Sequence, residues 1–222
     1  METGLVNQST TLSSQIGSPQ PGRAILPRLG SASRRAEYLL VVYPYGELQE
    51  KLQEEQQQFS TDYGLQMTVR NRPHITLAAF QAGEPMEDTL IRWIQRICNR
   101  YESFDLTLNN FSGFPPHTIY LRVQDPQPFR ELIRQLKAID DFVRSSGCPP
   151  VNLIGRPYLS IAGGLTEQVY NKAMPDYSRK TFHDTFHVDQ LVLLKREHAF
   201  DACKTVNIFR LLPATDVATA AH

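Results

Sequence analysis

A heptapeptide occurs twice in this chain, as RPHITLA at residues 72–78 and as RPYLSIA at residues 156–162. The first, second and last positions are identical, and three others are the conservative pairs Ile/Leu, Thr/Ser and Leu/Ile. Each copy lies in an extended pattern that is followed by a helical one. A similarity repeated at this distance, in the same context, predicts a duplicated lobe.

The repeat brings four polar side chains into matching positions. Alternate residues of a strand point to the same side, so His74 and Thr76 share one face and Tyr158 and Ser160 share another. If the two lobes pack with pseudo-twofold symmetry, these side chains converge on one cleft. Such a cleft has the geometry to hold a phosphate between its two walls.

The rest of the sequence alternates between strand and helix patterns. Period-2 and β-branched runs predict extended segments, and apolar residues three and four apart predict helices. Hairpins within this alternation favour an α+β fold with mixed or antiparallel sheets over a purely parallel one. The predicted strands or extended segments are 38–45, 67–80, 104–111, 117–123, 151–162, 188–195 and 204–212, and the predicted helices are 47–63, 85–101, 128–146 and 166–177.

Composition sets the limits of the folded domain. Residues 1–35 are rich in Ser, Gln, Thr, Gly and Pro without periodicity, which predicts a flexible leader. The folded domain is then expected over 36–213, with a short C-terminal tail over 214–222.

Charge and apolar content exclude some classes of protein. Lys plus Arg equals Asp plus Glu at 23 each, so no net field attracts polyanions. The sequence has neither a signal peptide pattern nor about 18 consecutive apolar residues, so we expect a cytoplasmic protein without membrane contact. The three cysteines are far apart and without C-x-x-C spacing, which indicates reduced thiols.

With both copies considered together, the motifs resemble the paired H-x-T/S motifs of the 2H phosphoesterase superfamily. That family includes RNA 2′,3′-cyclic phosphodiesterases, 2′-5′ RNA ligase-like proteins and cyclic nucleotide phosphodiesterases. The likeness extends to the turn at residues 113–115 and to the run DQLVLLKRE at 189–197, and so covers roughly residues 38–212. It implies two pseudo-symmetric lobes with helices on the outer faces and a central cleft.

The resemblance also implies the site residues. His74 and Thr76 match the first motif, while Tyr158 and Ser160 stand in the places of the second histidine and its hydroxyl partner. In the family, one imidazole takes a proton from the attacking water or hydroxyl and the other protonates the leaving oxygen, while the hydroxyls bind phosphate oxygens. No metal or cofactor is implied. The expected partner is the phosphodiester of an RNA end or nucleotide, and we expect a monomer.

The tyrosine departs from the family pattern, and its chemistry differs from that of histidine. A phenol, with an ordinary pKa of about 10, is no base near neutrality, although it donates a hydrogen bond or, less readily, a proton. Loss of one general acid or base costs about 10²- to 10⁴-fold in rate. Two hypotheses follow: a weakened phosphodiesterase in which His74 is the base, or a non-catalytic module that keeps the cleft and binds a phosphorylated ligand or a protein partner.

Other candidates have simpler explanations. Arg72 and Arg156 either steer a phosphate or form salt bridges at the starts of the strands. His183 and His187 lie in an extended segment, where four residues span about 13 Å, too far for one metal ion, so we interpret them as surface or edge-strand histidines. His117 belongs either to the cleft rim or to a solvated loop.

Overall fold

The computed structural model describes residues 35–65, 72–198 and 201–214. The predicted leader lies outside the described residues except for Arg35, with which the first strand begins, and the predicted tail lies outside them except for Ala214. Within the described residues, no helix is both long and apolar enough to cross a membrane.

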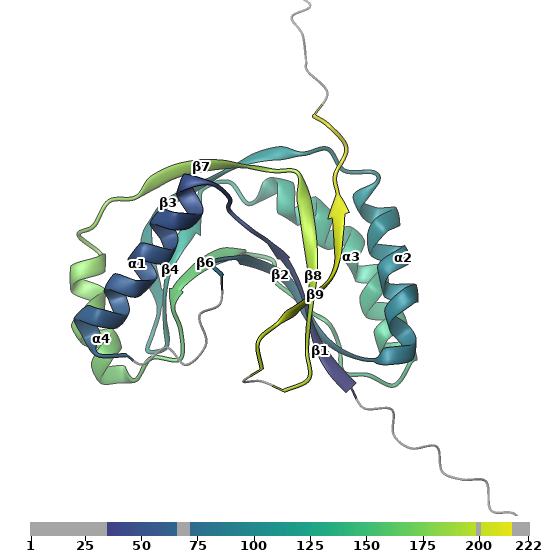
Figure 1. Ribbon diagram of the computed structural model, residues 1–222, viewed down its shortest axis with the longest axis horizontal. Helices are drawn as coiled ribbons and strands as arrows, with labels where there is room; N and C mark the ends of the chain where they lie inside the picture. The colour runs from purple at the N-terminus through teal and green to yellow at the C-terminus, as the bar shows by residue number, and fades with distance from the viewer. Residues whose placement is uncertain (1–34, 66–71, 199–200, 215–222) are drawn as a thin grey trace, which may run out of the picture. The chain divides into compact units, whose positions relative to one another are not determined.

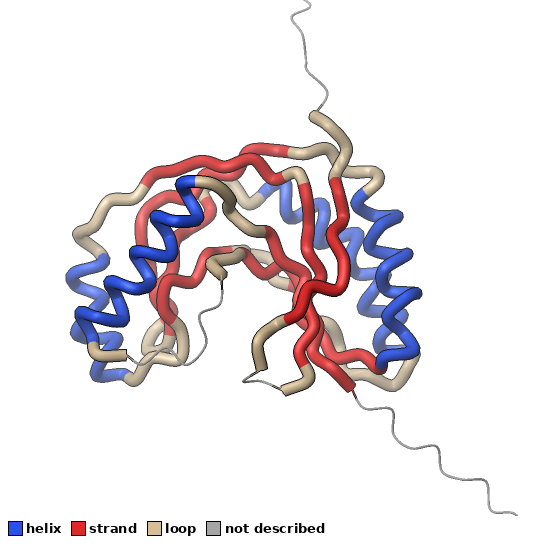
Figure 2. Tube along the Cα trace, viewed as in Figure 1, coloured by secondary structure: helices blue, strands red, loops and turns tan. Residues whose placement is uncertain are grey.

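The described residues form a nine-stranded sheet with four α-helices (Figures 1 and 2). The order across the sheet is β7-β3-β4-β6-β2-β1-β8-β9, with β5 paired to β2, and every ladder is antiparallel. The elements are β1 (Arg35–Val42), α1 (Glu47–Tyr63), β2 (Ile75–Gly83), a 3₁₀ turn (Glu84–Met86), α2 (Glu87–Cys98), β3 (Phe104–Phe114), β4 (Thr118–Val123), α3 (Gln127–Ser145), β5 (Asn152–Leu153), β6 (Tyr158–Ala162), α4 (Glu167–Tyr177), β7 (His183–Val188), β8 (Gln190–Arg196) and β9 (Lys204–Arg210).

The sheet has two halves that meet where β2 pairs with β6. The order β1-α1-β2-α2 is repeated as β4-α3-β6-α4, and the two repeats occupy corresponding places on either side of the junction. Helix α1 packs on β6 and helix α3 packs on β2, so each connecting helix covers the half to which its own strands do not belong. Figure 1 shows α1 beside α4 at one end of the sheet and α2 beside α3 at the other. The predicted duplicated lobes and α+β class are confirmed.

Local sequence signals account for the helices. Helix α1 has the predicted bounds, because Leu48, Leu52 and Phe59 form its buried face and Gly64 takes the left-handed conformation that ends it. Helix α4 begins after Thr166, whose hydroxyl accepts a hydrogen bond from the backbone N–H of Val169 at 3.4 Å.

The sequence prediction was wrong about how one extended segment divides into strands. The prediction placed a single strand over 188–195, whereas the chain forms β7 and β8 on either side of Asp189. Strand β7 pairs with β3 in one half of the sheet, and β8 pairs with β1 and β9 in the other. The segment is extended throughout, so periodicity alone did not reveal that the chain crosses between the halves at this residue.

Gly113, near the end of β3, provides a test of how α4 packs on the sheet. A Cβ atom at Gly113 would overlap the Tyr170 hydroxyl and the Met174 sulfur of α4, whereas one at Gly155 would meet no atom within 4 Å. Gly113→Ala should therefore lower the free energy of unfolding by about 1–3 kcal/mol, measured by urea denaturation. Gly155→Ala is the matched control and should leave the unfolding midpoint almost unchanged. Equal midpoints for the two variants would contradict this packing.

Candidate active site

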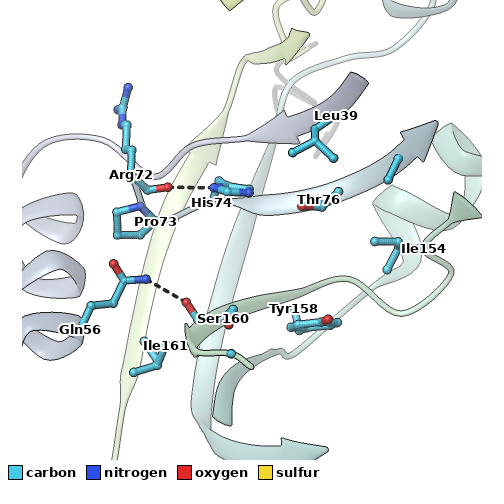
Figure 3. A pocket seen from close by; sticks show the side chains of 12 residues that line it. Leu39, Gln56, Arg72, Pro73, His74, Thr76, Ile154, Tyr158, Ser160 and Ile161 are labelled. Carbon is cyan, nitrogen blue, oxygen red and sulfur yellow. Dashed lines mark hydrogen bonds between the residues drawn. The ribbon is translucent and has the colours of Figure 1, made fainter. Parts of the chain in front are cut away.

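A cavity of about 370 Å³ lies at the junction of β2 and β6. This is within the size range of small-molecule sites. All four site residues predicted from the sequence repeat line it, as Figure 3 shows. The lining residues are Leu39, Gln56, Arg72, Pro73, His74, Thr76, Ala79, Ile154, Tyr158, Ser160, Ile161 and Gly163.

Strand register explains why these side chains share the cavity. Ile75 pairs with Leu159 in the antiparallel contact between β2 and β6, and both side chains are fully buried in the core. Their neighbours therefore point to the opposite face. By the same register, His74 lies across from Ser160, and Thr76 lies across from Tyr158. The core pair thus directs four polar groups to one place.

The imidazole of His74 is held in a defined tautomer. Its Nδ1 is 2.8 Å from the backbone carbonyl oxygen of Arg72, and a carbonyl only accepts, so Nδ1 carries the proton and donates it. In the neutral ring, Nε2 is then an unprotonated acceptor. Burial lowers the pKa of His74 below its ordinary value, and the hydrogen bond to Arg72 opposes this only in part. The ring is therefore neutral near pH 7.

Tyr43 contacts the imidazole ring of His74, and Arg72 in turn holds Tyr43 in place. The ring of Tyr43 meets the imidazole edge-on at a centroid distance of 5.8 Å. The guanidinium of Arg72 lies 4.3 Å from the centroid of Tyr43 and donates a hydrogen bond to the carbonyl of Pro44 at 3.1 Å. Among the described residues Arg72 forms no salt bridge, so the predicted ion pair is replaced by stacking on Tyr43, and Arg72 also lines the cavity.

Helix α1 supports the second motif. The side-chain amide of Gln56 donates a hydrogen bond to the backbone carbonyl of Ser160 at 3.0 Å (Figure 3). Sequence reasoning missed Gln56, because it lies in a run of helix-forming Glu and Gln residues where nothing distinguishes it. The same was true of Tyr43, which the prediction treated only as part of a strand.

The polar ends of the site are free to meet a ligand. Within residues 35–65, 72–198 and 201–214, no partner accepts or donates a hydrogen bond at His74 Nε2, the Thr76 hydroxyl, the Tyr158 phenol or the Ser160 hydroxyl. These side chains are half-buried, so their polar atoms can bind water or a ligand that replaces it. Four such groups around one cavity favour a ligand that both accepts and donates hydrogen bonds.

The remaining candidates lie outside the cavity lining. His183 and His187 belong to the edge strand β7, where the Nδ1 atom of His187 is 2.7 Å from a carboxylate oxygen of Asp105. His117 is exposed, with its Nδ1 3.3 Å from the carbonyl of Leu165, and Arg156 is also exposed. No group of three or more His, Cys, Asp or Glu side chains suited to a metal ion occurs in the described part of the chain.

The fold and the paired motifs define a protein of the 2H phosphoesterase class. Residues 47–199, more than half of the chain, match the profile of the 2′-5′ RNA ligase superfamily, and the chain belongs to this superfamily. No curated protein matches the sequence.

Solved structures share the fold at low sequence identity. LigT of E. coli in complex with 3′-AMP is 17% identical with a TM-score of 0.56, over 80% of this chain and 98% of that one. The protein TT0787 of Thermus thermophilus is 14% identical with a TM-score of 0.56, over 81% of this chain and 100% of that one. LigT of E. coli in complex with phosphate is 13% identical with a TM-score of 0.51, over 81% of this chain and 99% of that one.

The environment of His74 predicts its titration. Because burial lowers its pKa, the folded state binds a proton here less readily than the unfolded state does. Protonation of His74 therefore favours the unfolded state. The free energy of unfolding is unaffected by this residue above pH about 6.5, and it decreases as the pH falls from there toward the folded-state pKa. An NMR titration of the His74 ring, assigned with His74→Gln, should give a midpoint below about 6.5. A midpoint at or above that value would contradict the burial described above.

Proposed function

We propose that the cavity binds the phosphodiester of an RNA end or nucleotide, with a 2′,3′-cyclic or 2′-5′ linkage, and hydrolyses it slowly. The observation that carries this proposal is the state of His74, whose Nδ1 proton is committed to the carbonyl of Arg72 while Nε2 faces the cavity as an acceptor. Superfamily membership supports the choice of substrate class.

In the proposed reaction His74 is the general base. Its Nε2 takes a proton from water as the water oxygen attacks phosphorus, and the hydroxyls of Thr76 and Ser160 donate hydrogen bonds to the phosphate oxygens. The bond from phosphorus to the ribose oxygen breaks, and that oxygen receives a proton. Afterwards the imidazolium releases its proton to solvent, and the group that protonated the ribose oxygen takes one up from solvent. One water molecule is consumed, and no electrons are transferred to or from the protein.

This chain differs from the family motif in the residue that protonates the leaving oxygen. We assign the phenol of Tyr158 the role of donor to that oxygen, since it lines the cavity across from Thr76. A phenol is a weaker acid than an imidazolium, so the developing alkoxide is protonated less readily. A rate about 10²- to 10⁴-fold below that of a two-histidine site follows.

A second candidate is a binding module without turnover. It is favoured by the contacts of Tyr158, whose ring lies 5.1 Å from that of Phe114 and 4.9 Å from that of Tyr120 between centroids. Such contacts hold the ring in place, which suits recognition as well as proton donation. In this candidate the same phosphodiester is bound in the cavity and released unchanged.

Hydrolysis of nucleoside 2′,3′-cyclic phosphates and 2′-5′ dinucleotides distinguishes the two candidates. His74→Ala should lower kcat by about 10²- to 10⁴-fold, because it removes the only base that we assign to the reaction. His117→Ala is the matched control, since that histidine is exposed and lies outside the cavity lining. Turnover in the unaltered protein that persists in His74→Ala would refute the role of His74, and its absence in all three proteins would favour the binding module.

Replacing the tyrosine tests the second position directly. Tyr158→His should raise the hydrolysis rate by about 10²- to 10⁴-fold, because an imidazolium is the stronger proton donor and the register already places residue 158 across from Thr76. The rate is measured with the same cyclic phosphates, and circular dichroism checks the fold. A folded variant with an unchanged rate would mean that residue 158 does not reach the leaving oxygen.

A further inference from the structure

Three aromatic rings form one cluster beside the cavity. Phe114 stacks on Tyr120 with centroids 4.4 Å apart and planes 22° apart, and both rings contact that of Tyr158. They come from β3, β4 and β6, and we call this cluster the aromatic ledge. Tyr158 belongs to both the ledge and the cavity lining, so the two surfaces are continuous.

Phe114 leaves much of its ring in contact with water. Its exposed fraction is 45%, which is high for a large apolar side chain. The residue is nevertheless fixed in position, since it pairs with Thr118 in the ladder between β3 and β4. The preceding Gly113 packs closely on Tyr170 and Met174 of α4. An exposed ring on a rigid support binds a flat partner with little cost in conformational entropy.

We propose that the aromatic ledge binds the nucleobase of the ligand whose phosphate occupies the cavity. The inference rests on the proposed function, and it narrows the ligand to nucleotides and RNA ends with an unpaired base. Every nucleobase has a flat π-face, and stacking on an aromatic side chain is a common way in which proteins bind single-stranded nucleic acid. A sugar phosphate without a base would leave the ledge empty.

Among the residues that the structure describes, the wall of the site on the side of β1 and β8 has no equivalent aromatic surface. The cluster there consists mainly of aliphatic side chains, from Leu39, Val41, Val192 and Leu194. Its one aromatic ring, that of Tyr43, already carries the guanidinium of Arg72 on its face. The ledge is therefore the better support for a base.

A positive charge lies next to the ledge. Arg122 pairs with Tyr158 in the ladder between β4 and β6, and its side chain is exposed. Its Nε donates a weak hydrogen bond to the backbone carbonyl of Asn109 at 3.4 Å. The terminal nitrogens of the guanidinium point to no described acceptor. A cation at this position favours an anionic nucleotide over a neutral aromatic ligand.

The ledge also accounts for the tyrosine in the second motif. Histidine at residue 158 would keep a proton donor but would supply a smaller ring to the contacts with Phe114 and Tyr120. Tyrosine keeps a hydroxyl at the cavity and extends the aromatic surface. In this account Tyr158 contributes to recognition of the base as well as donating to the leaving oxygen.

Binding of adenosine 3′-monophosphate, compared with ribose 5-phosphate by calorimetry, tests the proposal without turnover. The full-length protein should bind the nucleotide more tightly than the sugar phosphate. Phe114→Leu should weaken nucleotide binding by roughly 5- to 150-fold and leave binding of the sugar phosphate unchanged. Phe114→Tyr, which keeps the ring, should bind like the unaltered protein. Trp93→Leu, which removes an exposed ring from α2, is the matched control.

Three results would overturn the proposal. The first is equal affinity for the nucleotide and the sugar phosphate, and the second is an unchanged affinity in Phe114→Leu. The third is tighter binding of a phosphotyrosine peptide than of the nucleotide. None of these binding results bears on the role of His74, which the hydrolysis assay tests separately. Loss of activity in His74→Ala together with no effect of Phe114→Leu would therefore reject the ledge and retain the proposed function.

Discussion

The backbone pairing of Ile75 with Leu159 joins the two halves of the sheet. Both side chains are fully buried, and they face the core on the same side of the sheet. This contact sets the register of β2 against β6, and the pairing of β5 with β2 adds to the junction. A shift by one residue would turn every side chain of a strand to its other face. The position of each polar group in the cavity therefore depends on burial of two aliphatic residues that do not line the cavity.

The connecting helices reinforce this junction. Helix α1 follows β1 in one half of the sheet but packs on β6 in the other, and helix α3 does the reverse with β2. Gln56 adds a hydrogen bond from α1 to the carbonyl of Ser160. Each motif strand is thus supported by a helix from the opposite half of the sheet, so separation of the halves would expose both helix interfaces to water. The cavity is consequently a property of the whole described domain.

The two walls of the cavity differ in character. On the side of β2, burial keeps His74 neutral by lowering its pKa, and the Arg72 carbonyl fixes its tautomer. On the side of β6, Tyr158 is part of a group of three rings with Phe114 and Tyr120. The two motifs therefore have different environments, and our proposals assign the general base to one and a proton donor that also supports the nucleobase to the other.

The sequence predicted those features that depend on local pattern. The internal repeat indicated the paired strands, and the apolar spacing with Gly64 indicated both ends of α1. It did not predict that the extended segment divides at Asp189, nor that α1 crosses to the other half of the sheet. Gln56 and the ledge were missed for the same reason. Their importance comes from residues far away in the chain, and no local periodicity records such contacts.

A crystal structure of this protein with adenosine 3′-monophosphate would test the central claim most directly. Our account predicts phosphate oxygens within hydrogen-bonding distance of the Thr76 and Ser160 hydroxyls and of the phenol of Tyr158, with the adenine against Phe114. A phosphate bound elsewhere on the protein, with the cavity between β2 and β6 left empty, would contradict it.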